Sequence, residues 1–136
     1  MVSSDSYFFK SIIFGGIEEI GWRYTFQPLL EKKIGFIATT ISIFFMWGIW
    51  HYLYFYIDGA LNKINAFGFF TGLLTNCFLL GMIYKKSGSL WLCVFTHSLI
   101  NTFSQIYTGG NEYINYISKI IIIVASSIIC LKTNKE

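Results

Sequence analysis

Residues 37–57, with the sequence IATTISIFFMWGIWHYLYFYI, decide the class of fold. This run of 21 residues contains no aspartate, glutamate, lysine or arginine, and it carries one histidine, His51. An α-helix needs about 20 mainly apolar residues to cross the hydrocarbon core of a bilayer. The stretch therefore predicts a membrane-spanning helix with a histidine inside it.

The composition of the whole chain agrees with a membrane protein. Of its 136 residues, 54% are hydrophobic and 12% are charged, and the mean hydropathy is +0.57. A soluble domain usually carries about 25% charged residues. The net charge is +3 and the basic residues form no stripe, which argues against nucleic-acid binding. Cys77, Cys93 and Cys130 stand singly, which argues against a disulfide framework or a thiolate metal site.

Four further apolar segments are expected, at residues 6–26, 64–84, 89–107 and 113–131. The pair Gln27-Pro28 is expected to end the first segment, because the residue before a proline is pushed out of helical geometry. Residues 30–36 are then expected to form a short interfacial piece. The sequence predicts an all-α, polytopic transmembrane helix bundle of about five membrane segments with short loops, in one membrane-embedded domain over residues 1–136.

The lysines predict an orientation. Alternating segments place six lysines on one side of the membrane and two on the other. The first group is Lys32, Lys33, Lys85, Lys86, Lys132 and Lys135, and the second is Lys10 and Lys63. The positive-inside rule places the lysine-rich side in the cytoplasm. Lys119, early in the fifth segment, is expected to snorkel to the interface.

Six polar residues fall inside the predicted membrane segments. Each charged group costs about 2.5–3.5 kcal/mol at the bilayer centre on insertion scales, unless it meets a partner or water. A functional centre is therefore the default interpretation. The six are Glu18, Glu19, Arg23, His51, His97 and Asn101.

Helical spacing divides the first three of these. Glu19 and Arg23 are i and i+4, so they share a face and can pair as charge compensation. Glu18 is rotated about 100° from Glu19 on an α-helix, so it can face the site as a free carboxylate. The alternative is that all three residues form a structural ion-pair cluster.

The histidines suggest hydrolytic chemistry. Trp47 can pack against His51 at i+4, and His97 shares a face with Asn101 in the same way. A hydrolase needs a base to activate water, a role that Glu18 and His51 could fill. It also needs donors for the developing oxyanion, which His97 and Asn101 could supply. Alternatively, a membrane histidine is a hydrogen-bond partner between helices.

The sequence requires no cofactor, although zinc is chemically possible. The chain has no HExxH, so the common zincin arrangement is absent. Two histidines and one carboxylate are nevertheless a known catalytic zinc set. If the protein is a metalloenzyme, the expected ligands are Glu18, His51 and His97.

At these residues the sequence resembles the CAAX protease and bacteriocin-processing family (CPBP, or Abi) of intramembrane endopeptidases. The family's members include type II CAAX prenyl endopeptidases and proteins like lysostaphin resistance protein A. Its first motif, EExxxR, corresponds to residues 18–23. Its FxxxH motif corresponds to residues 47–51, with Trp47 in place of phenylalanine, and its HxxxN motif to residues 97–101. The resemblance covers a motif core of residues 16–101.

The resemblance implies an intramembrane endopeptidase, glutamic-type or metallo, that cleaves a membrane-associated peptide or protein. Glu18 and His51 would activate water, and His97 and Asn101 would hold the oxyanion. Family members usually carry several helices before the first motif, so a partner subunit that supplies them is one expectation. The plasma membrane of a bacterium is the expected location.

Two other functions remain open at the level of sequence. A non-catalytic membrane protein, such as an immunity factor on the same fold, would use the polar residues for binding. An ion or proton transporter could use them as well, although no inverted repeat supports this. The complete polar set favours catalysis over both.

Overall fold

The computed structural model describes residues 12–13, 15–106 and 110–132, and in this part of the chain it contains helices and no strand. Residues 15–19 are helical and lead directly into the next element. The elements are a π-helix η1 (Ile20–Phe26), α2 (Gln27–Ile57), a 3-10 turn η2 (Leu61–Lys63), α3 (Ala66–Ser87), α4 (Leu90–Ile106) and α5 (Glu112–Lys132). The all-α bundle is confirmed.

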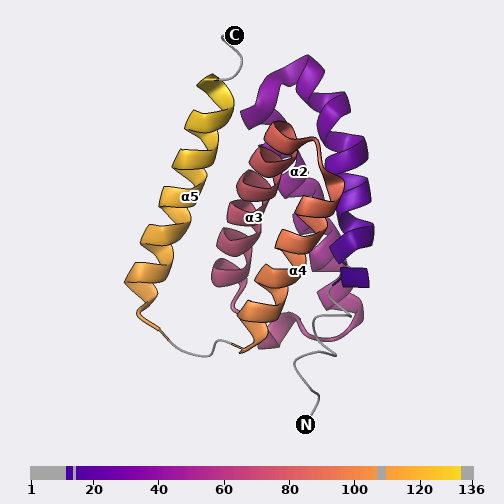
Figure 1. The fold of residues 1–136 in the computed structure, drawn as a ribbon. Coiled ribbons are helices and arrows are strands. Elements are labelled where there is room, and N and C mark those ends of the chain that lie inside the picture. Colours follow the sequence, from indigo (N-terminus) through magenta and orange to yellow (C-terminus); the bar gives the residue numbers. More distant parts are fainter. Residues whose placement is uncertain (1–11, 14, 107–109, 133–136) are drawn as a thin grey trace.

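The first long helix reverses direction at Gly35. This residue has φ 74° and ψ 172°, a left-handed conformation that glycine adopts without steric cost. Residues 15–34 run to one end of the bundle, and residues 36–57 run back from it (Figure 1). Gly35 therefore separates the two arms, whereas the sequence predicts that the first segment ends at Gln27-Pro28.

The prediction that Gln27-Pro28 ends the first helix is wrong, and residues 30–34 continue that helix instead of forming a separate piece. Gln27 keeps helical angles, and its backbone N–H bonds to the carbonyl of Trp22, five residues back. Pro28 is the second residue of α2 and follows directly on η1, so its missing N–H falls where the helix changes from π to α hydrogen bonding. The Gln27 side chain also donates to the Gly81 carbonyl at 2.9 Å, which fixes this point against α3.

The loop predicted at residues 85–88 is shorter than expected. Lys85, Lys86 and Ser87 belong to the last turn of α3. Gly88 ends the helix with φ 64°, and its N–H bonds to the Tyr84 carbonyl at 2.8 Å. A glycine in the left-handed region is a common helix C-cap, so one residue replaces most of the predicted loop.

Helix α3 is the centre of the bundle. It packs against α2, α4, α5 and η1. One apolar cluster lies between α2, α3 and α4, and consists of Ile43, Trp47, Leu73, Cys77, Leu80 and Cys93. A second joins α5 to α2 and α3, and consists of Phe36, Phe78 and Cys130. The three cysteines are therefore buried packing residues with free thiols.

Helices α4 and α5 lie on either side of α3 (Figure 1). Both pack on α3, but within the described residues they do not pack on each other. A strip of α3 is therefore left between them, and this arrangement positions the groove described below.

Three helices are long and apolar enough to cross a membrane: Gly15–Ile57, Ala66–Ser87 and Glu112–Lys132. The bundle also exposes many large apolar side chains, such as Ile49 and Trp50, which are 62% and 60% exposed. Such an outer surface suits lipid. The number of five membrane crossings is not confirmed and stays a prediction.

The lysines are distributed between the ends of the bundle as the sequence predicts. Residues 32–33, 85–86 and 132 lie at the end where Gly35 turns, and Glu31 pairs there with Lys85. Lys63, in η2, lies at the opposite end. Lys10 and Lys135 lie outside the described residues. The side of the membrane that each end faces stays a prediction.

Candidate active site

Glu19 and Arg23 form the ion pair that their spacing predicts. Arg23 Nε donates to Glu19 Oε2 at 3.1 Å, and both side chains are 0% exposed. Arg23 lies in η1, and π-helical turns are frequent at functional sites. Its guanidinium also lies 5.5 Å from the centre of the Trp47 ring, where a cation is attracted to the aromatic face. The buried charge is thus compensated twice.

His97 lies between the two glutamates. Its Nδ1 is 3.0 Å from Glu19 Oε1, a close contact that is not aligned as a hydrogen bond. Its Nε2 is 4.0 Å from Glu18 Oε2. The His97 side chain is 4% exposed and that of Glu18 is 26% exposed. Glu18 is therefore the accessible carboxylate of the pair, while Glu19 is enclosed.

The histidine that faces Glu18 is not the one predicted from the sequence. His97 is at ion-pair distance from Glu18, whereas in the described structure no ion pair joins Glu18 to His51. His51 is still within electrostatic range of the Glu18 carboxylate. The two glutamates and His97 therefore form the inner group, and His51 stands further out.

Trp47 separates the two histidines. Its ring centre is 5.8 Å from that of His51 and 5.4 Å from that of His97, with an edge-to-face angle of 81° to His97. The predicted packing of Trp47 on His51 is thus present. The indole is 1% exposed, and its Nε1 lies beside Glu18 without hydrogen-bond alignment. One aromatic ring fixes the spacing of both imidazoles.

The orientation of His51 leaves one ring nitrogen free to accept a proton. Nδ1 is 3.1 Å from the Trp47 carbonyl oxygen, and it must be the donor because a carbonyl oxygen only accepts. Nε2 is then the unprotonated nitrogen in the neutral ring. The rings of Phe55 and Phe69 lie 6.1 and 5.2 Å away, so the imidazole is held in an aromatic cage.

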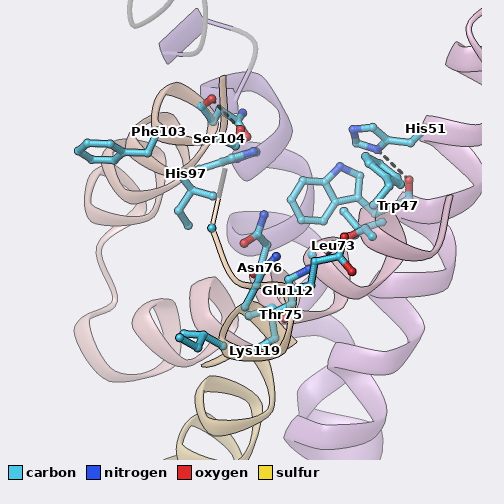
Figure 2. Close-up of a pocket in the computed structure, with 18 of the residues that line it drawn as sticks. Trp47, His51, Leu73, Thr75, Asn76, His97, Phe103, Ser104, Glu112 and Lys119 are labelled. Carbon is cyan, nitrogen blue, oxygen red and sulfur yellow. Dashed lines mark hydrogen bonds between the residues drawn. The ribbon is translucent and has the colours of Figure 1, made fainter. Parts of the chain in front are cut away.

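His51, His97 and Asn101 all line one cavity of about 1090 Å³. Figure 2 shows this cavity with His51 and His97 labelled. Its walls come from α2, α3 and α4 and, opposite α4, from α5. We call it the groove. The half-buried Asn101 lines it with His97, as the spacing of one helical turn predicts. Glu18 does not line the groove, but its carboxylate lies 4.0 Å from His97, which does.

Gly15 also belongs to the site, although its sequence position did not predict this. A Cβ atom added there would stand 3.3 Å from His97 Nδ1 and 3.4 Å from its Cγ, so the bare backbone lies against the imidazole. At the adjacent Gly16, a Cβ would meet Val94 at 3.4 Å. Small residues allow membrane helices to approach closely. The adjacent glycines just before the first motif could have indicated this close approach of two helices.

Asn76 is a second residue that was missed. Cys93 Sγ lies 3.6 Å from the Leu80 carbonyl, and α3 and α4 run in opposite directions (Figure 1). His97, four residues after Cys93, is therefore level with Asn76, four residues before Leu80. The half-buried Asn76 side chain lines the groove. An amide in the middle of an apolar segment was a signal for a polar role.

The residues suggested as zinc ligands do not form a metal site in this arrangement. Among the described residues, no three His, Cys, Asp or Glu side chains lie close enough together to hold a metal ion. His97 presents Nδ1 to Glu19, and His51 has no direct contact with Glu18. Glu18, His51 and His97 therefore do not fit zinc, and we derive no chemical step through a metal.

A sequence model of one protein family matches this chain. Its description is Type II CAAX prenyl endopeptidase Rce1-like, and it covers residues 6–103. The matched range holds more than two thirds of the chain and includes all three motifs, but it ends before α5 begins. Comparison with curated proteins and with solved structures gives no match.

Proposed function

The chain belongs to the Rce1-like family of type II CAAX prenyl endopeptidases, and on this premise we propose that it hydrolyses a peptide bond of a membrane-associated peptide or protein. The family and the three apolar helices together make it an integral membrane protein. The reaction, its residues and its substrate are the proposal, and the contacts around His97 support it.

The observation that carries the proposal is the approach of Glu18 to His97. Their facing atoms are 4.0 Å apart, and one water molecule can hydrogen-bond both, because each such bond spans about 2.8 Å. Glu18 then takes a proton from the water as it attacks the peptide carbonyl. Glu19, which Arg23 holds in place, lies against the other side of His97, so the imidazole keeps its orientation while charge develops.

His51 and Asn101 act from the groove. Asn101 can donate its amide N–H groups to the tetrahedral oxyanion, together with His97. His51 can accept a proton from solvent at Nε2 and deliver it to the leaving amine, since Nδ1 is already bonded to the Trp47 carbonyl. Glu18 returns the proton taken from the attacking water to solvent, so the cycle ends with both groups in their starting states. Every step uses residues of this chain and water.

The surroundings of the enzyme belong to the same proposal. We place the protein in the plasma membrane of a bacterium, with the lysine-rich end of the bundle in the cytoplasm. A partner subunit that supplies further helices would add to the exposed apolar surface around residues 15–34, where Ile17 and Leu29 are 65% and 62% exposed.

One observation favours a second candidate function. Glu18 does not line the groove, whereas His51, His97 and Asn101 do. A ligand could therefore occupy the groove without reaching the carboxylate. Such a groove would be sufficient for a non-catalytic membrane protein that binds a peptide, for example an immunity protein.

Glu18→Gln tests the choice between the two. The amide keeps the shape of the side chain but cannot act as a base, so cleavage should fall by at least about 10²-fold. Asp58→Asn is the matched control, because Asp58 is an exposed carboxylate at the end of α2. Cleavage of membrane proteins is compared in vesicles that contain each variant at equal level. Full activity of Glu18→Gln would contradict the proposal, and peptide binding by wild type without any cleavage would favour the binding protein.

A further inference from the structure

Lys119 places a positive charge in the groove. It lies in α5, a helix apolar enough to span a membrane, and its side chain lines the cavity (Figure 2). Its Nζ donates to Thr71 Oγ1 at 3.1 Å and approaches the Gly68 carbonyl at 3.4 Å. It also lies 5.2 Å from the centre of the Tyr116 ring. All of these partners are uncharged.

No ion pair compensates Lys119 within the described part of the chain. The acidic residue that also lines the groove is Glu112. It lies seven residues earlier on α5, about 10.5 Å along the axis, and is exposed. An uncompensated charge in a membrane segment is expensive and marks a functional position by default. Lys119 therefore has capacity for an anionic ligand.

The distance between Lys119 and the site fits a short piece of peptide. The Lys119 ammonium is held at the level of Thr71 on α3, and His97 is level with Asn76. Five residues of helix separate these levels, about 7.5 Å along the axis. An extended peptide covers about 3.3 Å per residue, so two or three residues span the interval.

We propose that Lys119 binds a carboxylate of the substrate, two or three residues from the peptide bond that lies at His97. The peptide occupies the groove between α4 and α5, where Asn76 and Asn101 offer amides to its backbone. This inference rests on the proposed proteolysis for the position of the cleaved bond, but the binding of the carboxylate does not depend on cleavage. Lys119 lies beyond the family match, which ends at residue 103, so α5 and not the matched motifs would supply this contact.

The test uses lipid-anchored, alanine-rich peptides with the full-length protein in detergent micelles. One set carries aspartate or asparagine at successive positions, and another ends in a free carboxylate or an amide. Binding is read from tryptophan fluorescence in the Glu18→Gln background, because Trp47 lines the groove. Cleavage of the same peptides is measured with Glu18 intact. The first set reports an acidic side chain as the ligand, and the second reports the chain terminus.

In one of the two sets, the charged peptide should bind about 10–100-fold more tightly than its neutral match, since a hydrogen bond to a charged group contributes about 1.5–3 kcal/mol. Lys119→Met should abolish this difference and Lys119→Arg should preserve it. Lys132→Met, an exposed lysine on the same helix, should change nothing.

The outcomes separate the two proposals. Equal binding of charged and neutral peptides with Lys119 present would overturn the inference, and that comparison needs no variant at position 119. An unchanged preference in Lys119→Met would also overturn it. A preference that depends on Lys119 without cleavage would support this inference and contradict the proteolysis. Cleavage at equal rates with and without the carboxylate would support the proteolysis and contradict this inference.

Discussion

The enclosed charges next to Trp47 and the polar groups that line the groove differ in how they are compensated. On the enclosed side, Glu19 and Arg23 neutralise each other's charge and are fully buried, although Glu19 Oε1 and both Arg23 Nη atoms make no hydrogen bond within the described residues. On the groove side, His51 has a free Nε2, and the Asn101 side chain makes no hydrogen bond within the described residues. Both groups of residues lie in the same membrane-embedded bundle, so we attribute the difference in how they are compensated to different roles.

This contrast shows how the bundle divides its polar residues. Where solvent is excluded, an unmatched charge is costly, so the enclosed residues pair with one another. Around a cavity, unmatched groups can meet water or a ligand, and they retain hydrogen-bonding capacity for it. The enclosed side should therefore control folding and the groove side should control reaction. Each prediction below tests one part of that division.

The largest effect on stability is expected on the enclosed side. Glu19→Gln leaves Arg23 without its counter-ion, so the free energy of unfolding should fall by about 3–5 kcal/mol. The neighbouring Glu18→Gln should lower it by less than about 1 kcal/mol, because Glu18 is partly exposed and not tightly paired. Denaturant titration of both variants in micelles measures this. Equal losses would show that all three charges form one structural cluster.

On the groove side, the expected loss is in rate. His97→Ala and Asn101→Ala should each lower the cleavage rate by about 10²–10³-fold if each donates to the oxyanion. Asn101→Ala should fold normally, because Asn101 is only half-buried. Single-turnover kinetics on a fixed peptide measures the rates. An Asn101→Ala enzyme with wild-type turnover would remove this residue from the chemistry.

A smaller effect should follow from crowding His97. Gly15→Val forces a branched side chain against the imidazole, which should cost about 1–3 kcal/mol in stability and displace His97 from Glu18. Gly21→Val is the matched control, because a Cβ at Gly21 meets nothing within 4 Å. Thermal unfolding and cleavage are compared for the pair. If both variants behaved alike, the contact of Gly15 with His97 would have no influence on the site.

The smallest effect is expected at Trp47 itself. Trp47→Phe keeps an aromatic ring between the histidines and removes an indole N–H that has no aligned acceptor. Activity should stay within about threefold of wild type, which corresponds to less than 1 kcal/mol in the barrier. Cleavage rates at equal protein level measure it. A tenfold loss would instead show that the indole N–H acts on Glu18.

The sequence predicts what depends on local geometry. Four of the five predicted segments match observed helices because runs of about 20 apolar residues are read directly from composition. The Glu19–Arg23 pair and the shared face of His97 and Asn101 follow from the helical period alone. These contacts need no knowledge of how the helices pack.

Features that depend on packing were missed or wrong. The chain has 12 glycines, and residue type alone does not show that Gly35 is the one that reverses the chain. The rule about the residue before proline considers only the local backbone, and Gln27 keeps helical angles within the packed bundle. The placement of His97 between both glutamates depends on the register of two helices distant in sequence. Lys119 was expected to snorkel to the interface, whereas its side chain lines the groove and bonds to Thr71.

The turn at Gly35 has a consequence for biogenesis. Since one residue joins the two arms, residues 15–34 and 36–57 can enter the membrane together as a helical hairpin. That hairpin already contains Glu19, Arg23 and the Trp47 ring that faces the guanidinium. Its strongest charges can thus be matched before α3 and α4 have left the ribosome. His97 enters later with α4. The site is therefore completed after the charges of Glu19 and Arg23 have already been paired within the membrane.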